Sequence, residues 1–222
     1  MKNLHLQTRS TLVACLSVLS LALLGSGCAT PRHRLADEGP SAKVVWVKGG
    51  ARWVSGDNAG QLVRVGDVLG PGTLIQTANK AEVELFLRHG PATKGREKDT
   101  VRLRENSLLG IDALSATDTN DAVMRDTQLD LKAGRMYCVV QHTPAPSRYE
   151  VRLPQGIAGT RGSIYEMSAE GVIEVFSGLV VLAYVRPDGT ITTQLIEAPQ
   201  NFDARTGTLN SSSVPKRMAV SK

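Results

Sequence analysis

Short runs in which apolar and polar residues alternate with a period of two constrain the fold of this chain most strongly. In AEVELFLR (81–88) a valine and two leucines fall on one face and charged residues fall on the other. TVRLREN (100–106) and RYEVRL (148–153) alternate in the same way. Because side chains of a strand point alternately to its two faces, each run predicts a strand with one buried face.

The stretch SGLVVLAYVRPDGTITTQLIEAP (177–199) predicts a hairpin more clearly than any other stretch does. Two β-branched runs flank the tetrapeptide RPDG. Pro187 presets its own φ angle, Asp188 tolerates a turn conformation, and Gly189 supplies the positive φ that such a turn needs.

No stretch shows a sustained helical period. The best helical candidate, 118–128, is short and polar, and it is interpreted as a loop or one helical turn. Gly49 and Gly50 separate two β-rich runs within 43–56, which indicates a hairpin or a tight bend. Aromatic residues make up 4% of the chain, so valine, leucine and isoleucine have to form the core. The predicted fold class is all-β, with many short strands in a sandwich, roll or short β-solenoid and little helix.

The N-terminal residues 1–27 have the pattern of an export signal. A segment with Lys2 and Arg9 precedes an apolar run at 11–24 that is shorter than a membrane span. The following GSGC resembles the lipobox of bacterial lipoproteins, in which the cysteine is lipidated and becomes the new N-terminus. Here Gly25 occupies the place of the usual leucine. Lipidation at Cys28 is the leading interpretation; soluble export and an uncleaved anchor stay open.

The rest of the chain divides into three parts. Residues 28–42 are polar with two prolines and predict a flexible tether, 43–199 form one β domain, and 200–222 are expected to be disordered. Removal of Lys2 and Arg9 with the signal lowers the formal net charge from +5 to +3, which does not indicate a polyanionic partner. Cys138 then stays as the only cysteine besides Cys28, and its apolar surroundings predict a buried, inert thiol.

The stretch PQGIAGTRGSIYEM (154–167) contains three glycines around one arginine. A phosphate-binding loop needs a helix after the glycines, but a strand-like run follows Gly162 here. The residues Gly159, Arg161, Gly162 and Ser163 are therefore interpreted as a structural or docking turn. We expect the Arg161 guanidinium to pair with backbone carbonyls or a carboxylate.

Other candidate sites are weaker. Lys94, Arg96 and Lys98 belong to an expanded loop, which is expected to be a solvated hairpin tip or a contact for an acidic partner. His89 and His142 each stand alone, so no metal site is predicted, and no nucleophile elbow is present. No cofactor is expected. The scarcity of aromatic residues argues against nucleic-acid binding.

The order of segments resembles the FecR-type periplasmic domain of iron-dicitrate sensory regulators. The resemblance is carried by VGDVLGPGTLIQTANKAEVELFLRHG (65–90), NSLLGI (106–111), LDLKAGRMYCVV (129–140), the glycine stretch with YEVRL before it, and VIEVFSGLVVLA (172–183), and it covers 43–199. The family has Arg-Gly-Thr where this chain has Arg161-Gly162-Ser163. A cleavable signal also replaces the cytoplasmic segment and transmembrane helix of the sensors.

The resemblance implies a domain that docks against other envelope proteins. We therefore expect a non-catalytic, lipid-anchored cell-envelope protein that binds a protein or a cell-wall polymer such as peptidoglycan. The alternative is a component of envelope signalling or transcriptional regulation that acts through a membrane partner. The lipid on Cys28 would face the periplasm, and Ala29 after it favours the outer membrane.

Overall fold

A computed structural model describes residues 39–56, 58–90, 99–118, 123–143 and 145–212 of the chain. All of them lie in one compact unit that spans Asp37–Lys222. Its strands are β1 (Ser41–Lys48), β2 (Ala51–Ser55), β3 (Asn58–Leu62), β4 (Val68–Leu69), β5 (Thr73–Thr77), β6 (Glu82–Arg88), β7 (Asp99–Leu103), β8 (Leu108–Asp118), β9 (Val123–Ala133), β10 (Arg135–Val140), β11 (Arg148–Leu153), β12 (Gly156–Ser168), β13 (Val172–Val185), β14 (Ile191–Glu197), β15 (Gln200–Asp203) and β16 (Thr208–Ser211).

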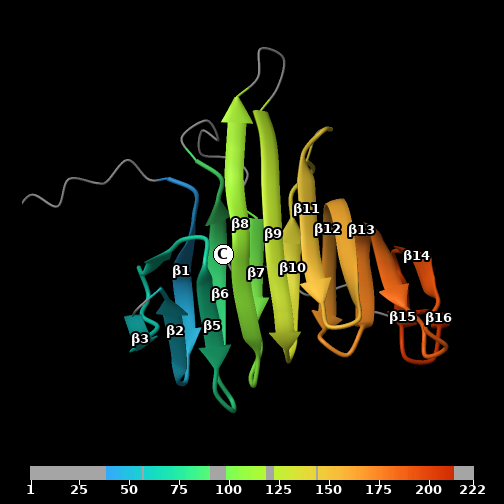
Figure 1. The fold of residues 1–222 in the computed structure, drawn as a ribbon, viewed down its shortest axis with the longest axis horizontal. Coiled ribbons are helices and arrows are strands. Elements are labelled where there is room, and N and C mark those ends of the chain that lie inside the picture. Colours follow the sequence, from blue (N-terminus) through green and yellow to red (C-terminus); the bar gives the residue numbers. More distant parts are fainter. Residues whose placement is uncertain (1–38, 57, 91–98, 119–122, 144, 213–222) are drawn as a thin grey trace, which may run out of the picture. The chain divides into compact units, whose positions relative to one another are not determined.

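These strands form one sheet. Neighbouring strands follow the order β3-β2-β5-β8-β9-β11-β12-β10-β7-β6-β1-β4. Beyond this path, β13 pairs with β12, β14 and β15, and β16 pairs with β15 (Figure 1). The described residues contain no helix, so the all-β prediction is confirmed. The described residues include no helix that is long and apolar enough to cross a membrane.

The sheet curls back on itself. β1 and β2 lie near opposite ends of the strand order, yet only Gly49 and Gly50 separate them in sequence. The two glycines therefore form a bend between the two arms of the sheet and not a hairpin. Gly49 has a φ of 71°, and a Cβ there would lie 2.9 Å from Ala81 Cα. Any larger residue would have to displace the backbone at Ala81.

The predicted alternation places the core between the two arms. In β6 the burial pattern alternates at every residue, and β7 and β11 keep their apolar residues inside as expected. One buried cluster joins Ile75 and Leu131 of one arm to Val101 and Met136 of the other. Cys138 belongs to this cluster, and its burial raises the pKa of the thiol to about 12, which confirms the prediction that it is buried.

The predicted hairpin around RPDG is confirmed. Val185 of β13 lies opposite Ile191 of β14, and the Gly189 amide donates to the Arg186 carbonyl at 2.9 Å. Gly189 has a φ of 84°. This is the conformation that the turn requires of a glycine.

Three sequence predictions need correction. The fold starts at Ser41 and not at residue 43. It also extends beyond 199, because β15 and β16 continue the sheet and Phe202 is 1% exposed in the core; residues 213–222 lie outside the described part. Finally, the polar run 118–128 was predicted to be a loop or one helical turn, but its described residues are in strands: Asp118 ends β8, and Val123–Gln128 lie in β9, which pairs with β8 in antiparallel orientation. Residues 119–122 lie outside the described part.

Candidate binding groove

β12 contains a bulge beside β13. Two residues of β12, Arg161 and Gly162, lie opposite Leu179 of β13 alone. An extra residue in one strand is a β-bulge, which bends the strand and leaves one residue without a ladder partner. Gly162 has a φ of 147°, a conformation that side chains disfavour.

The bulge changes which residues of β12 face the core. Ala158 and Thr160 are buried before it, whereas Ser163 and Tyr165 are buried after it. Because side chains alternate along a strand, an insertion of one residue shifts the buried set from even to odd positions. The sequence therefore shows two phases of alternation within one continuous strand.

This change of phase corrects the prediction of a turn over Gly159–Ser163. The turn between β11 and β12 lies at Pro154 and Gln155, and the glycine stretch is part of β12 itself. A break in alternation with glycine residues indicates a turn or a bulge equally well. The pairing of β12 with β13 on one side and with β10 and β11 on the other decides for the bulge.

Two buried hydroxyl groups join the strands across the bulge. Thr160 Oγ1 and Ser163 Oγ lie 2.6 Å apart, and both are within hydrogen-bond distance of the Leu179 carbonyl oxygen, at 2.9 and 2.8 Å. The Leu179 amide donates to Ser163 Oγ at 3.0 Å. Ser163 thus keeps the hydroxyl of the threonine that the resembling family has at this place.

Glycines allow three backbone segments to meet at the bulge. A Cβ on Gly162 would lie 3.0 Å from His142 Cα, and one on Gly178 would lie 2.4 Å from the Gly162 carbonyl oxygen. The Thr143 amide donates to the Arg161 carbonyl at 2.8 Å. The segment before β11, the bulge of β12 and the middle of β13 are therefore in direct backbone contact.

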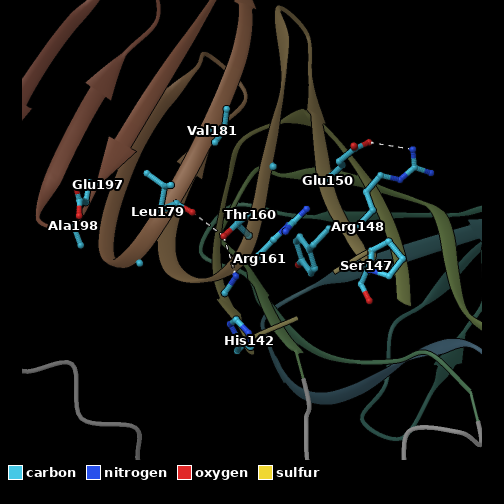
Figure 2. Close-up of a pocket in the computed structure, with 15 residues that line it drawn as sticks. His142, Ser147, Arg148, Glu150, Thr160, Arg161, Leu179, Val181, Glu197 and Ala198 are labelled. Carbon is cyan, nitrogen blue, oxygen red and sulfur yellow. Dashed lines mark hydrogen bonds and ion pairs between the residues drawn. The ribbon is translucent and has the colours of Figure 1, made fainter. Parts of the chain in front are cut away.

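A groove of about 910 Å³ lies over this junction (Figure 2). It is lined by His142, Pro146, Ser147, Arg148, Tyr149, Glu150, Gly159, Thr160, Arg161, Gly162, Gly178, Leu179, Val181, Glu197 and Ala198. All four residues of the predicted structural or docking turn lie at the groove. Gly159, Arg161 and Gly162 line it, and Ser163 contacts the lining residue Leu179 by accepting a hydrogen bond from its amide.

Arg148 on the rim of the groove is already paired. Its Nε and Nη2 donate to the two carboxylate oxygens of Asp126, each at 3.0 Å, and Nη1 lies 3.9 Å from Glu150 Oε2. The hydrogen bonds from Arg148 lower the pKa of Asp126 below its usual value. This two-point pair fixes the guanidinium of Arg148 in place.

Arg161 differs from Arg148. Its side chain is exposed and reaches into the groove (Figure 2). Among the described residues the guanidinium has no hydrogen-bond or ion-pair partner, so the pairing expected from the sequence is not found there. The backbone of Arg161 joins the neighbouring segment, and its cationic group stays available beside the exposed side chains of Leu179 and Val181.

The remaining predicted positions lie outside the described residues. These are the lipidation site Cys28 and the loop cations Lys94, Arg96 and Lys98. Their roles stay predictions.

The sequence analysis missed the second wall of the groove. Leu179, Val181 and Glu197 come from β13 and β14, which follow the glycine stretch in the chain. The signal for them was present: Leu179 and Val181 alternate with the buried Val180 and Leu182, so β13 is apolar on both faces. A strand that is apolar on both faces, at the surface of a sheet, indicates a second packing surface.

His89 also differs from the prediction of a lone histidine in a turn. It is 1% exposed, its Nε2 lies 2.6 Å from Thr127 Oγ1, and Asp99 Oδ2 lies 4.0 Å away. Burial and the nearby charge of Arg125 lower its pKa from 6.5 to about 4. Within the described part of the chain, no three His, Cys, Asp or Glu side chains gather as metal ligands.

Comparison with known proteins finds one family model that matches part of this unit. Residues 91–181 match the family model described as FecR protein. Two crystal structures of one proposed anti-sigma factor from Parabacteroides distasonis are similar at 12% identity and a TM-score of 0.43, covering 63% of this chain. The similarity covers 58% of the length of that protein. No curated protein sequence matches the chain.

Proposed function

We infer that this protein is a non-catalytic cell-envelope protein that binds a partner in the groove at the β12 bulge. The match of residues 91–181 to the FecR family model supports this inference. The observation that carries this inference is the exposed Arg161, which has no partner among the described residues and lies beside exposed Leu179 and Val181. Arginine next to apolar surface is the combination that protein-binding sites favour.

The geometry supports a partner that presents a carboxylate next to apolar side chains. Arg161 would receive the carboxylate, because a guanidinium can donate two parallel hydrogen bonds to it. The bulge is held by the hydroxyls of Thr160 and Ser163, so the backbone that carries Arg161 is preorganised. A protein partner in the envelope meets these requirements, and peptidoglycan, whose peptides carry carboxylates, is the second candidate.

Replacing Arg161 with alanine is expected to abolish most partner capture without lowering the stability of the fold. We expect the free energy of unfolding to change by less than about 0.5 kcal/mol, as for other exposed side chains. The measurement is photo-crosslinking in intact cells from a probe placed at Val181, followed by identification of the captured product. Isolated peptidoglycan, added in a parallel sedimentation experiment, distinguishes a polymer from a protein.

The matched control is Arg186→Ala, which removes the same charge at the β13–β14 turn, outside the groove. Crosslinking from Val181 should persist in this control. Equal capture in both variants would show that Arg161 does not contribute to binding, and a clear loss of stability in Arg161→Ala would assign Arg161 a structural role. Absence of any captured product from the probe at Val181 in the parent protein would refute the groove as the binding site.

Lipid anchoring at Cys28 is part of the proposed function and has its own test. Cys28→Ser should remove acyl labelling and release the protein from the membrane fraction, because the thiol is the attachment point of the lipid. Cys138→Ser serves as the control, since the Cys138 thiol is fully buried and should not be acylated. Membrane retention and acyl labelling that survive Cys28→Ser would contradict the anchor.

The FecR match also favours a second candidate function, a component of envelope signalling that acts through a membrane partner. Deletion of the gene would then change transcription of a defined set of genes, and Arg161→Ala would reproduce the change. An unaltered transcript profile would leave the structural binding role.

A further inference from the structure

The strands beside the groove present an apolar outer face, which consists of the side chains of β12, β13 and β14 that point away from the core. On β13, the side chains of Val181 and Val185 are 38% and 46% exposed. On β14, Leu195 and Ile191 lie directly opposite them and are 57% and 80% exposed. Exposed apolar side chains that gather on one surface mark a site of contact with another molecule. The groove lies at one end of this outer face, because Val181 lines it.

Two charges of opposite sign lie in one row across the outer face. Arg161 of β12 lies opposite Leu179 of β13, and Leu179 lies opposite Glu197 of β14 (Figure 2). Both charged side chains are exposed, and within the described part of the chain neither has a hydrogen-bond or ion-pair partner. Neighbouring strands are about 4.8 Å apart, so the backbones of the two charged residues are separated by about 10 Å. The row therefore reads cation, apolar residue, anion.

We propose that the partner in the groove is a second copy of this chain, which packs its outer face against the same face of the first copy. The proposal rests on the proposed function of the groove, because it identifies the partner that the groove takes. The two copies are related by a two-fold axis that runs parallel to β13 between the two faces. A half turn about this axis places the β12 side of one copy over the β14 side of the other. Arg161 of each copy then faces the partner's Glu197, a reciprocal contact of the kind that two-fold interfaces contain.

The charges also determine the direction of the axis. An axis through the same row but perpendicular to β13 would place Arg161 over the partner's Arg161, and Glu197 over the partner's Glu197. Like charges that face each other across an interface disfavour that arrangement. With the axis parallel to β13, each guanidinium meets a carboxylate and can donate two hydrogen bonds to it.

The neighbouring row is complementary in shape about the same axis. Gly159 of β12 lies opposite Val181 of β13, which lies opposite Leu195 of β14. The axis places the partner's Leu195 over Gly159, which has no side chain. Apart from its chain neighbours, a Cβ on Gly159 would meet only the Tyr149 carbonyl oxygen within 4 Å, at 3.8 Å. The space above Gly159 can therefore receive a side chain from a second copy.

The next row along the strands follows the same rule. Ile157 of β12 is 45% exposed and lies opposite Ala183 of β13, which lies opposite Thr193 of β14. The axis places the partner's Thr193 over Ile157, and the partner's Ala183 over Ala183. In both apolar rows a larger side chain on one side of β13 thus meets a smaller residue of the other copy. This allows the two sheets to approach to the roughly 10 Å at which aligned sheets pack.

Two charge reversals test the arrangement in intact cells, with full-length copies that carry two different affinity tags. One copy of each pair carries the photo-crosslinking probe at Val181, and a product that contains both tags reports self-association. Arg161→Glu paired with itself places two carboxylates at each contact, and Glu197→Arg paired with itself places two guanidinium groups there. We expect each of these pairings to lower the crosslink yield at least about tenfold relative to the parent.

The mixed pair gives the decisive comparison. Arg161→Glu expressed together with Glu197→Arg should restore the yield to within about twofold of the parent. Each contact in the mixed pair again joins one guanidinium to one carboxylate, because each variant supplies the charge that the other one needs. Recovery in the mixed pair also shows that both variants fold, since an unfolded variant would not associate in any pairing.

Gly159→Leu tests the shape of the interface. The new side chain would occupy the space that the partner's Leu195 needs, so we expect the crosslink yield to fall at least about tenfold. The matched control is Gly60→Leu on β3, outside the outer face. An added Cβ at Gly60 also meets no atom closer than 3.8 Å, and the yield should stay at the parent level.

The outcomes separate this proposal from the proposed function. Products captured from Val181 that contain another protein, and never both tags, would overturn the second copy as the partner and leave the groove as the binding site. Equal yields in the self-paired and mixed charge variants would overturn the two-fold arrangement. Absence of any product in the parent would overturn both the second copy and the groove.

Discussion

Replacing Gly178 with alanine is expected to destabilise the protein by about 3 kcal/mol, from backbone strain and overpacking together. Gly178 has a φ of 80°, and an added Cβ would lie 2.4 Å from the Gly162 carbonyl oxygen and 2.7 Å from Ser163 Oγ. Both atoms belong to the bulge, so neither can move without breaking the hydrogen bonds that join Ser163 to Leu179. Chemical denaturation followed by circular dichroism measures the effect.

Gly189→Ala is the matched control for this prediction. Gly189 has nearly the same φ, 84°, but an added Cβ there would meet no atom within 4 Å. The control therefore keeps the backbone strain, about 1 kcal/mol, and removes the clash. If Gly178→Ala costs no more than Gly189→Ala, the contact between β13 and the bulge is not as tight as described, and the groove loses its rigid floor.

Acidification from pH 7 to pH 4 is expected to remove on the order of 3 kcal/mol of stability through His89. Burial and the nearby Arg125 lower the pKa of His89 from 6.5 to about 4. The unfolded chain therefore binds a proton between these values and the folded protein does not. The contribution of His89 is complete above pH 6.5 and is lost as the pH falls toward 4.

His89→Gln should flatten this part of the stability profile, because an amide can bond to Thr127 without titrating. The groups around His89 are Thr127 on β9, Asp99 on β7, and Arg125 and Asp126 on β9. His142→Gln is the control, since His142 is exposed. A profile between pH 4 and 6.5 that is identical in the parent and in His89→Gln would contradict the prediction.

Local patterns were sufficient for the individual strands. The alternation in β6 predicts its buried face residue by residue, and RPDG predicts the turn between β13 and β14, because both depend on neighbours within a few positions. The strands after residue 199 were harder to predict from local patterns. NFD at 201–203 contains a single large apolar residue, Phe202, whose burial depends on pairing with β13, about thirty residues earlier in the chain.

The groove could be predicted only in part. Gly159, Arg161, Gly162 and Ser163 stood out in the sequence as a cluster with a special backbone, and they do lie together at the groove. Their role as a bulge depended on a partner strand that the pattern does not identify. The sequence predicted that the Arg161 guanidinium forms a structural pair. It is exposed instead, because β12 turns the side chain of Arg161 away from the core.

The sequence by itself determined the all-β class, the buried faces of β6, β7 and β11, and the tight turn at Gly189, since period-two alternation and turn chemistry are local properties. Only the tertiary structure decided the strand order, in which β11 lies between β9 and β12, and the curl that brings β1 and β2 together. It also decided that Thr160 and Ser163 meet Leu179. Contacts between residues far apart in the chain depend on packing the whole core at once, which no short stretch encodes.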